Sequence, residues 1–477
     1  MRKVRSERLE VRGERLLSVL AVVLLALSAW GQVSVSEGQP LSAFEKIRQN
    51  RNFSASNYCI YPDSTLPALT PAPEGKKPFY ISHYGRHGSR YLSNRKAYDI
   101  PYRMLCRADS LALLTPTGKD VLRELRHIID DSEGRWGDLT GLGKRQHRQI
   151  ACRMVERFPE VFSDGAYVDA RSTTVTRCVL SMGAAVQQLV ALNPRLDVTM
   201  RASRKDMWYM NHQDTLLRNR METPETRQAF NAFCQPLIGN YRLMQMLFTD
   251  VDAARKVLDG LVATLQPRNG EQWLNYYLIL SGLIQQNTRM SERSQLVDLF
   301  TYEDFHCFWQ CENAWWYANY GPSPLNGGDQ PYSQRYLLRH MIHEADSCLR
   351  LPRPGASLRF GHETVMLPLT CLLGINGFDF QTADLAALEP NGWWACLVFP
   401  MASNIQLVFY RSSPDDKDIV IKVLLNEQEA TLPVPTDIAP YYRWRDFRDY
   451  YLRRLDSYER GRRSKDKGKR LLPTSSI

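Results

Sequence analysis

The sequence lacks any hydrophobic run long enough to cross a membrane. Its apolar stretch at Leu16–Leu27 falls short of the roughly 20 residues that a transmembrane helix needs, and no later stretch approaches that length. Six basic residues precede this stretch and Ala29-Trp30-Gly31 follows it, which is the pattern of a secretory signal peptide. Residues 1–31 are therefore predicted to be a signal peptide. We expect an exported protein, periplasmic or secreted, with no stable membrane anchor.

The ten cysteines form no zinc-binding pattern. Neither a C-x₂-C pair nor an H-E-x-x-H motif is present, so the sequence predicts no metal site and no cofactor. Cysteines of an exported chain can form disulfides, and Cys307 and Cys311 are close enough in sequence to be one candidate pair. The connectivity stays open. Cys178 and Cys371 lie inside apolar helical patterns and are expected to be buried as small hydrophobic residues.

Surplus charge is also scarce outside the two ends of the chain. The formal net charge is +10, of which the first 31 residues contribute +3 and residues 457–477 contribute +5. About +2 is left for the body of the chain, too little for the basic face that nucleic-acid binding requires. We therefore expect no nucleic-acid partner. Residues 457–477 are predicted to be a solvated, disordered tail.

What the sequence does contain is a strand that runs into a cluster of cations. Residues 79–84 have the pattern of a buried strand, and Gly85 is expected to let the backbone turn. Arg86, His87 and Arg90 follow within five positions. Each guanidinium is a planar fork of donors that stays charged and can bind two phosphate oxygens, and a neutral imidazole between two such forks can attack phosphorus. The alternative is a surface histidine between solvated arginines.

A third arginine is predicted near the start of a helix. Arg177 follows a short strand-like run at Ala166–Val168, and Ser172 or Thr173 is the expected N-cap. The helix macrodipole favours anions at this end, so an arginine here makes better sense as a ligand for phosphate than as a partner of the dipole. The alternative is an exposed arginine on the helix surface.

A second junction between a strand and a helix carries a histidine and a carboxylate. Ser357–Phe360 has the pattern of a strand, Gly361 is expected to turn it, and His362-Glu363-Thr364 begins a helix. The loops at Arg86 and at His362 thus both follow strands, which is where open α/β sheets bind ligands. The alternative for His362 alone is a satisfied histidine in the core.

Arg86-His87-Gly88-Ser89-Arg90-Tyr91 resembles the signature of the histidine acid phosphatases, the branch that includes phytases and multiple inositol polyphosphate phosphatases. The resemblance implies that the motif histidine takes the phosphoryl group, that Arg177 is the third phosphate-binding arginine, and that His362-Glu363 is the second motif. That motif is His-Asp in many members and His-Ala-Glu in the inositol polyphosphate subgroup. Here Glu363 follows His362 directly, and Thr364 stands at the later position.

The resemblance also implies the fold, an α/β protein whose core is a three-layer α/β/α sandwich with an α-helical insertion domain. We expect the core to comprise residues 32–200 and 346–456. The insertion is expected at residues 201–345, where helical patterns such as Glu225–Leu247 and Gln272–Gln286 have few strand signals between them. Such an insertion would form one wall of the substrate cleft.

Together these features predict a phosphomonoesterase that acts on a phosphorylated small molecule through a phosphohistidine at His87, with inositol polyphosphates, phytate-like compounds, as candidate substrates. Glu363 would protonate the leaving alkoxide. The predicted phosphate ligands are Arg86, Arg90, Arg177 and His362. Two alternatives stay open: a general acid or sugar phosphatase of the same family, and a non-hydrolytic protein that binds a phosphate ligand.

Overall fold

The structure is a computed structural model that describes residues 41–62, 66–211, 214–221, 223–239, 241–265, 268–288 and 294–470. The chain divides into two compact units, residues 1–42 and residues 43–477, and every element below belongs to the second unit. The predicted signal peptide lies outside the described residues. Within the described part of the chain, no helix combines the length and the apolar character needed to cross a membrane.

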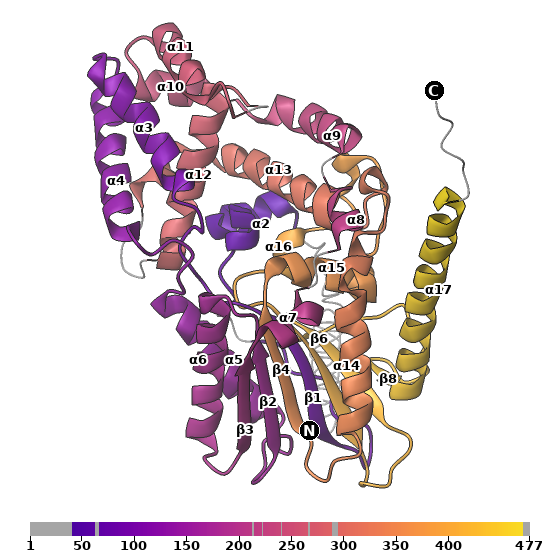
Figure 1. The fold of residues 1–477 in the computed structure, drawn as a ribbon. Helices are drawn as coiled ribbons and strands as arrows, with labels where there is room; N and C mark the ends of the chain where they lie inside the picture. The colour runs from indigo at the N-terminus through magenta and orange to yellow at the C-terminus, as the bar shows by residue number, and fades with distance from the viewer. Residues whose placement is uncertain are drawn as a thin grey trace, which may run out of the picture. The chain divides into compact units, whose positions relative to one another are not determined.

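An eight-stranded mixed sheet lies at the centre of the second unit (Figure 1). Its strand order is β3-β2-β4-β1-β5-β6-β7, with β8 paired to β6. The strands β3, β2, β4 and β1 run parallel to one another, whereas β5 to β8 pair in the antiparallel sense. The bounds are β1 Lys77–Arg86, β2 Tyr167–Ser172, β3 Asp197–Ala202, β4 Gly355–Gly361, β5 Asn404–Arg411, β6 Val420–Leu425, β7 Gln428–Glu429 and β8 Tyr441–Arg443.

Helices cover both faces of this sheet. On one face α5 (Gly141–Arg157) and α6 (Thr176–Leu192) pack against strand residues such as Ile81 and Leu358. On the other face α14 (Arg335–Cys348), α15 (Glu363–Leu373) and α17 (Trp444–Arg470) pack against residues such as Tyr80 and Tyr84. Successive side chains of β1 therefore pack into two separate hydrophobic cores, one on each face of the sheet. The predicted three-layer α/β/α sandwich is confirmed.

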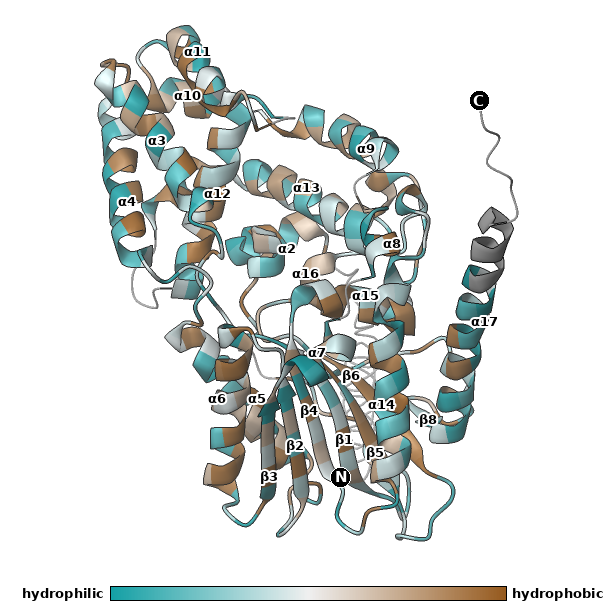
Figure 2. Cartoon of the chain, in the orientation of Figure 1, coloured by the Kyte–Doolittle hydropathy of each residue, from teal (hydrophilic) through white to brown (hydrophobic). Residues whose placement is uncertain are grey.

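A further hydrophobic cluster joins helices from three separate parts of the chain. It takes residues from α2 (Ala43–Gln49) and η1 (Arg51–Tyr58), from α3 (Lys96–Ser110) and α4 (Pro116–Ser132), and from helices between β3 and β4. Figure 2 shows α3, α4 and α12 with hydrophobic and hydrophilic residues in alternation, as expected for helices that bury one face. This helical layer lies beyond the carboxyl ends of the parallel strands (Figure 1).

The segment between β3 and β4 is helical, as its periodicity predicts. Its 3₁₀ turns are η2 (Gln235–Leu237), η3 (Gln295–Leu299), η4 (Pro324–Asn326) and η5 (Gln330–Gln334). Its α-helices are α7 Arg204–Met210, α8 Thr215–Arg218, α9 Pro224–Cys234, α10 Tyr241–Leu247, α11 Val251–Val262, α12 Gly270–Thr288, α13 Tyr302–Tyr320 and α14. The boundaries at 201 and 345 stay predictions, because the cluster also contains α3 and α4.

The C-terminal segment differs from its prediction. Helix α17 continues to Arg470, through most of the stretch that was expected to be a disordered tail. Tyr458 stacks on Tyr332, and Arg462 forms an ion pair with Asp214. The charge and glycine content of this stretch predicted disorder. The ion pair between Arg462 and Asp214 instead attaches the helix to the rest of the molecule.

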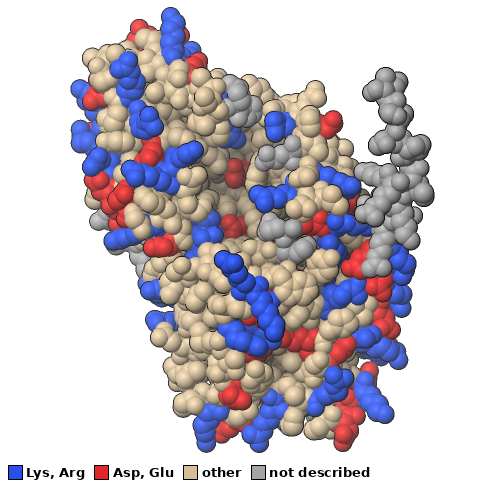
Figure 3. Space-filling model, viewed as in Figure 1, with Lys and Arg blue, Asp and Glu red and all other residues tan. Residues whose placement is uncertain are grey.

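All ten cysteines are free thiols, the candidate pair Cys307 and Cys311 included. Cys178 and Cys371 are buried, as their apolar surroundings predict. Basic and acidic side chains are interspersed over the face shown in Figure 3, and no wide expanse of one sign covers that face.

Candidate active site

The site lies at the carboxyl edge of the parallel strands. Strand β1 ends at Arg86, its neighbour β4 ends at Gly361, and β2 on the far side of β4 ends at Ser172. Backbone hydrogen bonds continue just past these ends: His87 N donates to Gly361 O at 3.0 Å and Thr173 N donates to Phe360 O at 3.1 Å. Parallel register thus places the residues that follow each strand next to one another.

Two glycines of this edge do not act as the sequence suggested. Gly85 and Gly361 were expected to turn the backbone, but both lie within their strands and neither has a positive φ. Their role is close approach. A Cβ at Gly361 would meet the Tyr84 hydroxyl oxygen at 2.0 Å, and one at Gly85 would meet the His83 ring at 2.6 Å. Glycine is therefore required for packing at these two positions.

The loop after β1 is anchored to the start of α5. A Cβ at Gly88 would lie 2.5 Å from Gly143 O, so the two backbones touch. Thr140, the N-cap of α5, donates from its backbone N and from Oγ1 to Ser89 O at 2.9 and 3.0 Å. Gln146 Oε1 accepts from Ser89 N at 2.9 Å. These contacts fix the backbone around His87.

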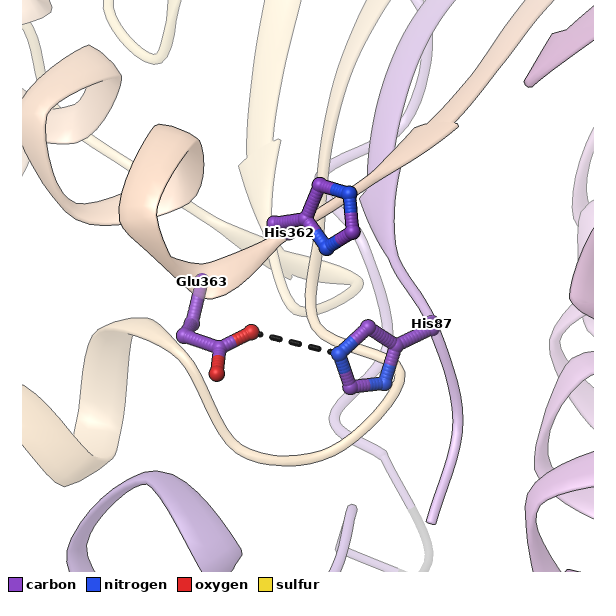
Figure 4. A group of neighbouring side chains, drawn as sticks. All are labelled: His87, His362 and Glu363. Atoms are coloured by element: carbon purple, nitrogen blue, oxygen red, sulfur yellow. Dashed lines mark ion pairs between the residues drawn. The ribbon is translucent and has the colours of Figure 1, made fainter. Parts of the chain in front are cut away.

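Glu363 is the centre of the charged group that this edge assembles. One carboxylate oxygen, Oε2, lies 3.2 Å from Arg86 Nε and 3.2 Å from His87 Nε2, and Oε1 lies 3.4 Å from Arg90 Nη2. Figure 4 shows the carboxylate pointing at the imidazole of His87, with His362 beside them. We call Arg86, His87, Arg90 and Glu363 the anion seat, because cations surround the position of the carboxylate.

Arg86 is held rigidly although it is fully buried. Its Nη1 donates to Asn57 O and to Phe399 O, both at 2.6 Å, and burial lowers its pKa to about 10. In the described part of the chain, three buried guanidinium nitrogens at the site have no hydrogen-bond partner: Arg86 Nη2, Arg90 Nε and Arg177 Nε. Buried donors without partners cost free energy, and oxygens of an anion would satisfy them.

His87 presents a free nitrogen to the seat. Its Nδ1 lies 3.0 Å from Gly88 O, so a protonated Nδ1 donates to this carbonyl and leaves the lone pair on Nε2. Burial lowers the pKa of His87 well below its usual value, and the neighbouring Glu363 only partly offsets this. The imidazole is therefore neutral and nucleophilic.

The direction in which the pKa of Glu363 shifts is set by its neighbours and not by burial, which dominates the pKa of His87. Burial alone would raise the pKa of Glu363. Arg86, with contributions from His87 and Arg90, lowers it by more than burial raises it, so the pKa of Glu363 lies well below its usual value. The carboxylate is charged while the two guanidinium groups and the imidazole face it. Loss of any of them, or arrival of another anion among them, would raise this pKa again.

His362 and Arg177 join the same site from two other elements. His362 is the N-cap residue of α15, and its Nε2 lies 3.2 Å from Thr173 Oγ1. Arg177 is the second residue of α6 and lines one cavity with His362 and Glu363. The predicted N-cap was wrong, because α6 begins at Thr176 after Val175. Thr173 instead bonds the histidine, a role that the sequence did not reveal.

The segment before the first strand supplies two residues that sequence reasoning missed. Asn57 Nδ2 donates to Glu363 Oε1 at 3.3 Å. The ring of Tyr58 lies 5.0 Å from the guanidinium carbon of Arg90, within cation–π range. Both residues belong to η1, which precedes β1 in the chain. No motif marks them, and only the fold brings them to the seat.

A cavity of about 390 Å³ opens from the seat toward the helical layer. Its far side is formed by α8 and η5, which we call the distal wall. Arg177 and Arg218 are cations that line the cavity, and the carboxylates that line it are Glu363 and Asp214. A cavity of this size has room for a small molecule next to Glu363.

His87, His362 and Glu363 also bring three possible metal-ligand atoms within 4.8 Å of one another. The guanidinium groups of Arg86, Arg90 and Arg177 lie close enough to interact electrostatically at this site. Their three positive charges repel a dication and attract a dianion. The site therefore suits an oxyanion at the position that the Glu363 carboxylate occupies, next to His87 Nε2.

Comparison with known proteins agrees with this chemistry. The family model of the histidine phosphatase superfamily (branch 2) matches residues 85–426. This chain belongs to that superfamily. It is a phosphatase, and the anion seat contains the motif by which the family resemblance was recognised. No curated protein matches the sequence.

Solved structures with the same fold are distant in sequence. A multiple inositol polyphosphate phosphatase from Bifidobacterium longum, in complex with inositol hexasulfate, shares 18% identity at a TM-score of 0.68, over 82% of this chain and 96% of that chain. The phytase from D. castellii shares 12% identity at a TM-score of 0.61, over 90% of this chain and 89% of that chain. These likenesses show a common fold over most of the chain.

Proposed function

We propose that this phosphomonoesterase is an exported enzyme that hydrolyses inositol polyphosphates through a phosphohistidine at His87. The observation that carries the proposal is the geometry of the anion seat. A carboxylate lies among Arg86, Arg90 and His87, at 3.2 Å from a neutral nucleophilic nitrogen. A phosphoryl group of the substrate would take this place, because it carries the same charge pattern on oxygens that the same donors can bind.

In the first step His87 Nε2 attacks phosphorus. The hydrogen bond from Nδ1 to Gly88 O holds the ring and supports the positive charge that develops on it. Arg86, Arg90 and Arg177, together with His362, bind the phosphoryl oxygens, where charge spreads in a loose transition state. The P–N bond forms as the P–O bond to the alcohol breaks.

Glu363 acts as the proton donor of this step. In the free enzyme the guanidinium groups keep the carboxylate ionised. A bound phosphate dianion displaces it from the seat and adds negative charge next to it, and both changes raise its pKa. The carboxyl group then protonates the departing alkoxide, and in the second step it accepts a proton from the water that attacks the phosphohistidine.

The substrate class rests on the cavity. The space of about 390 Å³ beyond the seat is lined by polar side chains and by Arg177 and Arg218, which suits a leaving group that carries further phosphates. The Bifidobacterium longum structure of the same fold holds inositol hexasulfate, a polyanion of this kind. The signal-peptide pattern of residues 1–31 supports export.

Phosphate release from purified enzyme tests the proposal. We expect turnover of inositol hexakisphosphate with a kcat/KM at least tenfold above that for a sugar monophosphate, because only the polyphosphate meets the cations of the cavity. A general acid or sugar phosphatase would show the reverse order. Binding of these compounds without phosphate release would identify a binding protein.

A further inference from the structure

The C-terminal helix reaches the substrate cavity through a single carboxylate. Asp214 lines the cavity, yet its side chain is only 2% exposed, because guanidinium groups cover it from two elements. Arg335 Nη1, from α14, lies 2.7 Å from Oδ2. Arg462, from the far end of α17, donates from Nη1 to Oδ2 at 2.5 Å and from Nη2 to Oδ1 at 3.3 Å.

Asp214 also holds the distal wall in place. Its Oδ1 accepts from Leu216 N and Leu217 N at 3.1 and 3.2 Å, which caps α8. Gln330 of η5 donates to Leu217 O at 2.6 Å, so the two parts of the wall are joined. Tyr458 of α17 stacks on Tyr332 of η5 at 3.9 Å. The end of α17 therefore packs against both parts of the wall, and Figure 1 shows this helix running along that side of the molecule.

The charge balance of the cavity gives this contact a function. Arg86 and Arg90 offset the charge of Glu363, so Asp214 is the other lining carboxylate whose charge must be offset. Burial would raise the pKa of Asp214, but Arg462, the capped amide of Leu217 and Arg335 hold it well below its usual value. Asp214 is thus an ionised carboxylate in a cavity that is proposed to bind a polyanion. The positive charges of Arg335 and Arg462 reduce its repulsion of that substrate.

We propose that Arg462 is a positioning residue for substrate specificity: it adds a second positive charge at Asp214, beside that of Arg335, and thereby allows the cavity to accept a leaving group that carries several phosphates. This inference rests on the proposed function and deepens it. A substrate with one phosphate, held in the anion seat, leaves little charge near the distal wall. The effect of Arg462 is therefore selective for polyphosphates and acts on KM more than on kcat.

Three variants separate charge from structure. Arg462→Gln removes the positive charge and keeps a long polar side chain. Asp214→Asn removes the negative charge and keeps an N-cap residue of equal quality. The double variant removes both charges. The matched control is Arg460→Gln, which makes the same change on an exposed face of α17 two residues away.

With inositol hexakisphosphate we expect Arg462→Gln to raise KM on the order of tenfold at low salt, with kcat within twofold and a smaller effect at high salt. Asp214→Asn leaves KM unchanged or lower, and the double variant behaves like Asp214→Asn. KM for an aryl monophosphate changes less than twofold in every variant. If the Asp214–Arg462 ion pair only held the distal wall in place, Asp214→Asn would raise KM as Arg462→Gln does. An increase of KM in both variants therefore overturns the proposal.

Binding of inositol hexasulfate, measured by calorimetry on the same proteins, supplies a readout without turnover. We expect the dissociation constant to rise about tenfold in Arg462→Gln and to recover in the double variant. Unchanged binding in Arg462→Gln, with a wild type that binds, overturns this inference alone. A wild type that hydrolyses the aryl phosphate but neither binds nor hydrolyses the two polyanions overturns the proposed substrate class, and this inference with it.

Discussion

The anion seat and the distal wall are built in different ways. The seat takes its side chains from positions next to the ends of paired strands, and its members are at most 7% exposed. The wall consists of short helical turns between β3 and β4, whose positions depend on ion pairs with α14 and α17. Strand register fixes the relative positions of the reacting side chains. The residues of the distal wall, which lie on short turns, can be replaced without moving the side chains of the seat. We infer that the sheet fixes the reacting groups and that the helical layer selects the substrate.

The largest effect is expected from the seat. His87→Ala should lower kcat by at least about 10⁴-fold on every phosphate ester, since no other described residue presents a neutral nitrogen at the position of Nε2. His127→Ala, at an exposed histidine of α4, is the control and should keep full activity. Phosphate release by the His87 variant at a rate near that of wild type would remove the seat from the reaction.

Glu363→Gln should come next and should depend on the leaving group. General acid catalysis contributes roughly 10²–10⁴-fold, so kcat on inositol hexakisphosphate should fall by that factor. For an aryl phosphate with a good leaving group the chemical step needs no proton, and the formation of the phosphoenzyme should change little. Equal losses in pre-steady-state release of both alcohols would show that Glu363 is no proton donor.

Arg177→Ala tests the part of the site that lies between the seat and the wall. Loss of one preorganised cation from the transition state should lower kcat/KM by about 10²–10³-fold. Arg177→Lys should restore little, because a point charge does not replace the guanidinium fork. Arg195→Ala, which removes a surface ion pair with Asp164, is the matched control. Steady-state kinetics near wild type in Arg177→Ala would assign this residue to the helix surface.

The smallest effect concerns the competition between Glu363 and phosphate. In wild type a phosphate ion must displace the carboxylate from Arg86 and Arg90, whereas in Glu363→Gln it meets guanidinium groups without a counter-charge. Orthophosphate should therefore bind about tenfold tighter to the variant, a change that calorimetry can resolve. Weaker binding to the variant would mean that the carboxylate and the phosphate occupy separate places.

Local patterns could bring the residues of the seat together because these residues lie in two short motifs. Arg86, His87 and Arg90 share one loop, and His362 and Glu363 share another, so a strand pattern followed by a helix pattern was enough to place both loops at one sheet edge. The sequence could not place Asn57, which reaches Glu363 from 306 positions away. Its contact depends on how η1 crosses the end of β1, and no periodicity encodes that crossing.

Other misses have equally local causes. Helix α13 buries polar residues such as Asn313 and Asn319 together with its apolar ones, so its sequence shows little helical periodicity. The turn expected at Gly85 ignored the ring of His83, which needs the space that a Cβ would fill. Residues 457–470 of α17 were predicted to be part of a tail because their charges resemble those of a solvated segment, and the sequence does not show that Asp214 is the partner of Arg462.

The central claim is that the phosphoryl group passes through His87, and one measurement tests it directly. Wild type and Glu363→Gln are mixed with an aryl phosphate, quenched in base within milliseconds, digested and analysed by mass spectrometry. We predict an acid-labile, base-stable phosphoryl group on the peptide that contains His87. It should reach a higher level in Glu363→Gln, because the variant forms the phosphohistidine but lacks the base for its hydrolysis. A phosphoryl group on any other residue, or turnover without a phosphorylated peptide in either protein, would contradict the account.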